Sequence, residues 1–165
     1  MRARSIRVIW VAAVFSAFLG CKGGGSGAAA SDCTYKHQNP GFCLSPPAGW
    51  QPRAESTYPD GTTLDFAGST ATLELKWGGN VPFDSTISAM KVHPGPGSST
   101  TLVGEGDLPN GGYWKHTSSM NNGKLEHHVT YLAKGKAAGV GCQGGSADTA
   151  TFEAMLAACK TLVVD

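Results

Sequence analysis

Five cysteines place the strongest limit on how this chain can fold. Cys33 and Cys43 lie near the start of the region with mixed apolar and polar residues, and Cys142 and Cys159 lie near its end. Cys21 stands alone between an apolar run and a glycine tract. An odd number of cysteines in an exported chain indicates an unpaired thiol or an intermolecular bridge. The fate of Cys21 therefore decides whether the other four can pair completely.

The first 20 residues have the layout of a bacterial export signal. Arg2, Arg4 and Arg7 precede an apolar run from Val8 to Leu19, without any acidic residue. The run is 12 residues long, whereas a membrane-spanning helix needs about 20. We therefore interpret residues 1–20 as a signal peptide that directs export and takes no part in the fold.

The segment "FLGC" resembles the lipobox of bacterial lipoproteins, in which a cysteine after a small residue is lipidated and then begins the mature chain. Gly20 and Cys21 fit that pattern, whereas Phe18 and Leu19 depart from it, because the family usually has leucine and then a small residue there. The resemblance implies acyl chains such as palmitate on Cys21. The alternative is cleavage after Ala30, at a second small-residue site. Either outcome removes Cys21 from the disulfide count.

Residues 21–32 read as a lipid-anchored, glycine-rich tether, because "KGGGSGAAASD" has too little apolar bulk to offset its chain entropy. One globular domain, residues 33–165, would follow beside the membrane. In enteric bacteria an aspartate after the lipidated cysteine is a retention signal, and this chain has Lys22 there instead. This difference favours the outer membrane, on its periplasmic or surface face. We expect a lipid-anchored protein of the cell envelope.

The remaining four cysteines are expected to form disulfides in this oxidising compartment. Four cysteines allow three connectivities. We favour Cys33–Cys43 with Cys142–Cys159, because each pair is close in sequence and each closed loop contributes about 3 kcal/mol in the chain-entropy model. A zinc site would require short paired spacings such as C-x-x-C, and the chain has none.

Charge excludes nucleic acids as partners. From Cys21 onward the chain has 10 Lys and Arg against 12 Asp and Glu, because the three signal arginines are removed. Binding to DNA or RNA needs a clustered basic face that neutralises phosphates. We expect a membrane contact through the lipid anchor and an envelope protein as partner.

Alternating apolar and polar residues predict a strand-rich domain. "ATLELKWGG" places Leu73, Leu75 and Trp77 on one face and Glu74 and Lys76 on the other. Antiparallel strands are expected at 41–45, 62–68, 71–79, 100–108, 111–120, 124–134 and 136–142, a short helix at 82–93, and a longer helix within 146–164.

The longer helix carries one apolar stripe. Phe152, Met155, Leu156 and Cys159 recur at helical spacing, and Ser146 or Asp148 can cap its start. A buried Cys159 would face the sheet and the strand that ends at Cys142.

Three short segments, "PPAGW", "GGYW" and the closing "CKTLVV", stand in an order that resembles the PsbP and Mog type of α/β sandwich, over about residues 41–164. Trp50 and the closing "TLVV" are the best single matches. The resemblance implies an α+β fold, an antiparallel sheet with helices packed on it. That group shares no catalytic residues, and its members act mainly as binding or assembly modules. The expected disulfides depart from its general pattern.

Enzyme motifs are few. "GVGCQG", from Gly139 to Gly144, matches G-x-G-x-x-G but lacks the parallel strand-helix-strand unit that a dinucleotide site needs. The chain has no G-x-S-x-G, P-loop or H-E-x-x-H segment. We therefore expect no cofactor.

His116, His128 and Glu126 are the candidates for a metal site. A three-residue loop at "NNG" would bring them to one face of a hairpin, as two imidazoles and a carboxylate suited to zinc or copper. A shift of one residue would separate them, because side chains alternate faces along a strand. The alternative is that they are ordinary exposed strand residues.

Tyr113 and Trp114 are the candidates for a binding surface, because consecutive strand residues cannot both face the core. The outward one is either covered by a helix or free to anchor a partner. The sequence thus predicts a non-enzymatic binding or assembly module anchored in the envelope. The alternatives are a metal-binding or hydrolytic enzyme that uses the histidines, and an inert structural surface protein.

Overall fold

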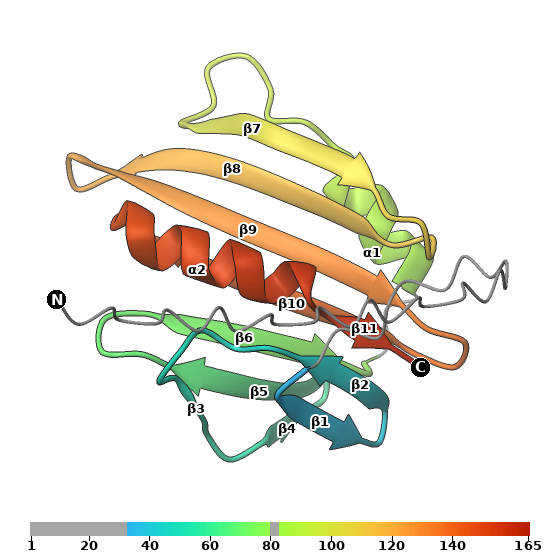
Figure 1. Ribbon diagram of the computed structural model, residues 1–165. Helices are drawn as coiled ribbons and strands as arrows, with labels where there is room; N and C mark the ends of the chain where they lie inside the picture. The colour runs from blue at the N-terminus through green and yellow to red at the C-terminus, as the bar shows by residue number, and fades with distance from the viewer. Residues whose placement is uncertain (1–32, 80–82) are drawn as a thin grey trace, which may run out of the picture.

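The computed structural model describes residues 33–79 and 83–165 (Figure 1). Within these ranges eleven strands form two antiparallel sheets. The small sheet contains β1 (Tyr35–Gln38), β2 (Gly41–Leu44) and β11 (Val163–Val164). The large sheet contains β3 (Gln51–Pro52), β4 (Ser56–Tyr58), β5 (Gly61–Ala67), β6 (Thr72–Trp77), β7 (Thr100–Asp107), β8 (Tyr113–Asn121), β9 (Lys124–Lys134) and β10 (Gly139–Ser146). The helices are α1 (Phe83–Met90) and α2 (Thr149–Lys160).

The expected signal peptide, Cys21 and the tether lie outside the described residues. In the part of the chain that the structure describes, no helix is long and apolar enough to cross a membrane.

The expected fold class, α+β with helices packed on a sheet, is wrong. Strands account for 49% of the described residues and helices for 15%, so the fold is β-rich. The reason lies in the two helical segments. α1 has only eight residues and buries none of them, so it cannot form a layer. The predicted longer helix ends at Lys160, and the "VV" that follows pairs with β2 as β11.

The large sheet has two chemically different faces. Its strands run in the order β3-β5-β6-β10-β9-β8-β7, and β4 also pairs with β5. Opposed residues in an antiparallel ladder share a face. On β6, Leu73, Leu75 and Trp77 are buried, whereas Glu74 and Lys76 lie on the other face, which confirms the predicted alternation. We call these the apolar face and the polar face.

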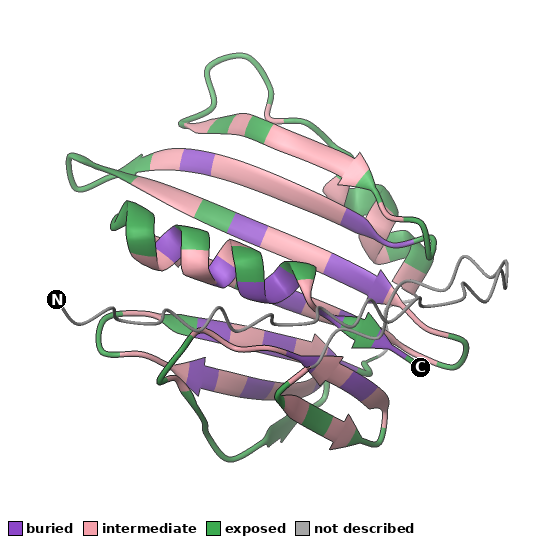
Figure 2. Ribbon diagram, in the orientation of Figure 1, coloured by how far each residue is buried: buried purple, intermediate pink, exposed green. Residues whose placement is uncertain are grey.

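α2 covers the apolar face along β9 and β10 (Figure 1). Its predicted stripe faces the sheet, with Phe152, Met155 and Cys159 at most 1% exposed and Leu156 partly buried (Figure 2). Asp148 caps the helix, because its side chain accepts a hydrogen bond from the Thr151 amide at 2.8 Å.

The small sheet packs over the apolar face of β5 and β6. The Phe42 ring lies 5.3 Å from that of Trp77, and the Tyr35 ring meets the Phe66 ring edge-on at 5.0 Å. Together with α2, these contacts close one core, because buried residues from both sheets and the helix belong to a single apolar cluster. The polar face takes no part in this core.

Both expected disulfides are present. Cys33 is bonded to Cys43 with 5.8 Å between their Cα atoms, and Cys142 to Cys159 with 5.6 Å. The second bond joins β10 to the C-terminal half of α2. The four cysteines therefore serve the framework of the domain, and the predicted connectivity is confirmed.

α1 lies at one end of the polar face. Its Phe83 ring occupies the space above Gly139, and Asp84 pairs with the Lys134 ammonium at 2.8 Å. Lys115 donates to the carbonyls of Met90 and Val92, at 2.6 and 2.7 Å, where the helix ends. A cation at a helix C-terminus is favourable, so these bonds fix α1 to the sheet.

Candidate functional site

One row of polar side chains crosses the polar face of the large sheet. The pairing register places its members directly opposite one another on successive strands: Asp65 on β5, Glu74 on β6, Gln143 on β10, Thr130 on β9, Lys115 on β8 and Glu105 on β7. α1 covers the Lys115 end of this row. The Asp65 end remains open.

A depression of about 460 Å³ marks this open end. Its polar side chains come from four strands: Asp65, Thr72, Glu74, His128, Thr130 and Gln143. Two carboxylates, an imidazole, an amide and two hydroxyls thus converge on one concave patch. Such a set recognises a ligand through hydrogen bonds and charge.

Asp65 and Glu74 are like charges that face each other across β5 and β6. Directly opposed like charges destabilise a sheet by a few tenths of a kcal/mol to about 1 kcal/mol. Gln143 donates a hydrogen bond to Glu74, but no salt bridge to either carboxylate occurs among residues 33–79 and 83–165. Lys76, on the same face, instead pairs with Asp60 at 2.6 Å, and this bond raises the pKa of Lys76.

His128 forms the rim of the depression. Its ring lies directly against Gly145 of β10, where a side chain would overlap it. The Glu126 carboxylate lies 3.8 Å from its Nε2 atom, and the His128 side chain is 46% exposed. Gly145 therefore positions an accessible imidazole at the edge of the carboxylate pair.

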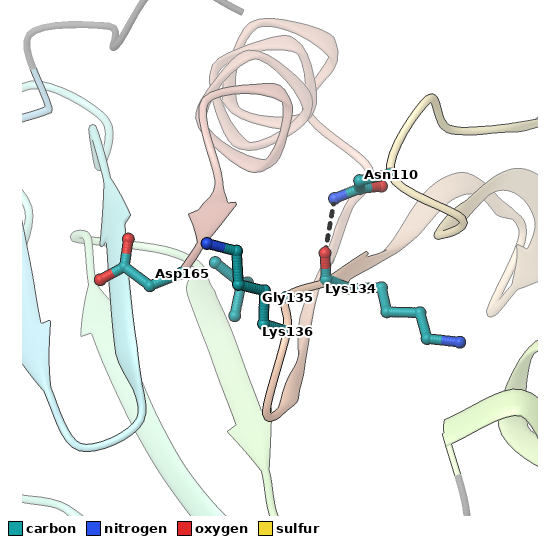
Figure 3. Close-up of a pocket in the computed structure, with 6 residues that line it drawn as sticks. Asn110, Lys134, Gly135, Lys136 and Asp165 are labelled. Atoms are coloured by element: carbon teal, nitrogen blue, oxygen red, sulfur yellow. Dashed lines mark hydrogen bonds between the residues drawn. The ribbon is translucent and has the colours of Figure 1, made fainter. Parts of the chain in front are cut away.

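A second depression, of about 670 Å³, lies where the β9–β10 loop meets β11 (Figure 3). Its lining comprises Asn110, Lys134, Gly135, Lys136, Val164 and Asp165. The side chains of Asn110 and Lys134 here serve the fold. The Asn110 amide donates to the Lys134 carbonyl at 3.0 Å and accepts from the Gly112 amide at 3.1 Å. The Lys134 side chain extends away from Asp165 toward its partner Asp84. We therefore place the candidate site in the first depression.

The expectation that His116, His128 and Glu126 share a face is wrong. The turn at "NNG" has two residues, Asn122 and Gly123, both with positive φ, so Asn121 pairs with Lys124. This register sets His116 opposite Val129 on the apolar face, whereas His128 and Glu126 lie on the polar face. In the described ranges, no group of three His, Cys, Asp or Glu side chains is arranged to hold a metal ion.

The two candidate aromatic residues, Tyr113 and Trp114, lie on opposite faces of the sheet. Tyr113 is buried and Trp114 is half-buried. Tyr113 is 4% exposed beneath α1, donates a hydrogen bond to Glu105, and lies 5.1 Å from the Lys91 ammonium. Burial raises the pKa of Tyr113 to about 12, and the bond to Glu105 acts in the same direction. Trp114 lies across Gly104 and Gly106 of β7 and is half-buried. Tyr113 is therefore a packing residue, not a docking residue.

No protein-family model and no curated protein matches this chain. The resemblance to the PsbP and Mog type therefore stays a prediction.

The glycines of "GVGCQGG" have a structural role. β10 lies antiparallel between β6 and β9, so the parallel unit of a dinucleotide site is not formed. Neighbouring side chains fill the space above each glycine: Phe83 at Gly139, Leu132 at Gly141, Met155 at Gly144 and His128 at Gly145. Close packing from both faces explains this motif.

Sequence reasoning missed Asp65, Gln143, Thr72 and Thr130 as members of one site. Alternation in the β6 segment did place Glu74 on the polar face. It could not show which residues of β5, β9 and β10 lie beside Glu74, because that depends on the pairing of strands far apart in sequence. The signal available was local alternation, which sets Asp65 between Leu64 and Phe66 and Thr130 between Val129 and Tyr131.

Proposed function

We propose that the protein is a lipid-anchored module of the bacterial cell envelope that binds a partner protein through the depression around Asp65 and Glu74. The anchor rests on the sequence near Cys21, which lies outside the described residues. The binding role rests on the polar face. The observation that carries it is the pair of directly opposed carboxylates, neither of which forms a salt bridge within residues 33–79 and 83–165.

The chemistry of the depression favours a partner that supplies hydrogen-bond donors. Carboxylates accept strong hydrogen bonds from arginine or lysine, and the Gln143 and Thr130 side chains can add neutral bonds. A basic side chain placed between Asp65 and Glu74 would relieve their repulsion. The partner would therefore present arginine or lysine at the centre of its contact surface.

Photo-crosslinking in the native host tests this proposal. A photoreactive amino acid at Gln143, on the polar face, should give one reproducible adduct with an envelope protein. The matched control carries the photoreactive amino acid at Lys160, an exposed position on α2, and should not give that adduct. The double substitution Asp65→Asn and Glu74→Gln should remove the adduct, whereas Asp84→Asn, which removes a carboxylate of α1 outside the depression, should leave it.

Adducts that are absent, or that are the same from both positions, would favour the alternative of an inert surface protein. The hydrolytic or metal-dependent alternative is not retained, because its three side chains lie on two faces of the sheet.

The anchor has a separate test. The intact mass of protein extracted from membranes should exceed that of the chain beginning at Cys21 by the mass of its acyl groups. The Cys21→Ser variant should lack this mass and leave the membrane fraction. A native protein that begins after Ala30 would contradict the anchor while leaving the binding proposal open to the crosslinking result.

A further inference from the structure

Two imidazoles share a hydrogen bond beneath α2. His116 of β8 and His127 of β9 are diagonal neighbours on the apolar face, and their Nε2 and Nδ1 atoms lie 3.0 Å apart. Ser118 lies directly opposite His127. Diagonal cross-strand neighbours are within reach of long or aromatic side chains. This histidine pair belongs to neither depression on the surface.

The histidine pair supports the first turns of α2. Both rings pack on Phe152, with centroids 4.6 and 5.2 Å from its ring. Phe152 is 1% exposed, and the two imidazoles are among the side chains that bury it. Farther along the helix, the disulfide from Cys159 to Cys142 holds α2 to β10 covalently. The two halves of α2 are thus attached in different ways.

Protonation acts against the noncovalent attachment. One nitrogen of the pair must accept the shared hydrogen bond, so the bond survives a single protonated ring but not two. Two imidazolium ions would also repel each other. They would lie at the start of α2, where the helix dipole already disfavours positive charge.

We propose that His116 and His127 form an acid-sensitive latch, which holds the N-terminal half of α2 on the sheet and releases it when both rings are protonated. The disulfide keeps the C-terminal half in place, so α2 opens as a flap and uncovers the apolar surface around Val129. This inference is independent of the proposed binding role of the polar face.

The groups around the histidine pair support release of α2 in acid. Burial lowers the pKa of His116, His127 lowers it further, and Glu153 of α2 acts more weakly in the opposite direction. Gly104 of β7 faces His116 and Ser146 of β10 faces His127, and neither brings a titratable side chain near physiological pH. Because the pKa of His116 is lowered in the folded state, its contribution to the closed state is present above the ordinary value of 6.5 and is lost as the pH falls below it.

Amide hydrogen exchange at about pH 7.5 and about pH 5 tests the latch. After correction for the intrinsic pH dependence of exchange, protection of residues 149–156 should fall roughly tenfold or more in acid, and that of residues 157–160 should change less. The double variant His116→Gln and His127→Gln, which keeps polar side chains but cannot titrate, should lose this pH dependence. The matched control His128→Gln, on the opposite face, should keep it.

Three outcomes would overturn the latch: an unchanged acid response in the double variant, loss of the response in the His128→Gln control, or equal exchange of both halves of α2 at the two pH values. If the double variant does not fold, NMR titration of the wild-type imidazoles decides. Titration of His116 at its ordinary pKa would contradict the proposal, and a depressed titration of His116 that is coupled to His127 would support it.

Discussion

The ring of Phe83, at the start of α1, lies directly above Gly139 of β10, where a Cβ atom would overlap it. α1 buries no residue fully, so this contact is one of the few that hold the helix to the sheet. Gly139 is therefore needed because it leaves room for the Phe83 ring, and not because of its backbone freedom.

The variant Gly139→Ala is expected to destabilise the domain by about 1–3 kcal/mol, because the added methyl group must displace the ring or the strand. Urea unfolding with the disulfides intact measures the change. Gly95→Ala is the control, since no atom lies within 4 Å of a Cβ there, and its effect should stay within about 0.5 kcal/mol. Equal losses in both variants would show that Phe83 does not depend on this space.

Removal of the Cys142–Cys159 bond should cost the domain about 3 kcal/mol or more. The closed loop has a sequence separation of 17, and both cysteines are fully buried, so the double alanine variant also leaves a cavity. The Cys33–Cys43 variant, with a separation of 10, should lose less, because Cys43 is only half-buried. Chemical denaturation of the two double variants gives the comparison. A larger loss from the N-terminal pair would contradict this order.

The parts of the fold that could be predicted are those set by local pattern. The stripe from Phe152 to Cys159 repeats at the helical period, and it is buried as the sequence predicts. The alternation of Leu73, Glu74 and Leu75 likewise assigned their faces. Each pattern depends only on neighbours in sequence, and so could be read without the fold.

The parts that could not be predicted depend on register and on how much of a segment becomes buried. The turn has two residues, Asn122 and Gly123, and not the three that were expected. His116 and His128 therefore lie on opposite faces of the sheet. The α+β expectation was wrong because the sequence predicts a short helix in this region but does not show that α1 would bury none of its residues. The site around Asp65 and Glu74 needs the order of strands, which no local pattern contains.

Lys115 should stabilise α1 through its two carbonyl contacts. Hydrogen bonds from a charged donor contribute more than neutral ones, so Lys115→Met is expected to cost about 1–2 kcal/mol. Hydrogen exchange should rise first at residues 83–92, because the bonds reach Met90 and Val92. Lys124→Met, at the exposed β8–β9 turn, removes the same charge without such contacts and should leave exchange in α1 unchanged. Uniform faster exchange across the domain would argue against a local role.

Alkaline titration should identify Tyr113 as a strongly perturbed tyrosine. Its pKa is about 12, against an ordinary value of 10.0, first because of burial and then because of the bond to Glu105. A raised pKa in the folded state means that the contribution of Tyr113 to stability is complete below pH 10 and is lost as the pH rises through about 12. The tyrosinate absorbance of wild type minus that of Tyr113→Phe isolates this group.

The variant Glu105→Gln should lower the pKa of Tyr113, because it removes a negative charge that opposes ionisation. The pKa should nevertheless stay above 10, since burial is the larger cause and remains. In the same variant, His93 loses its partner at 2.6 Å, so the segment after α1 should exchange its amides faster while α2 is unaffected. An unchanged tyrosinate titration in Glu105→Gln would mean that burial alone keeps Tyr113 protonated and that Glu105 acts only on the loop.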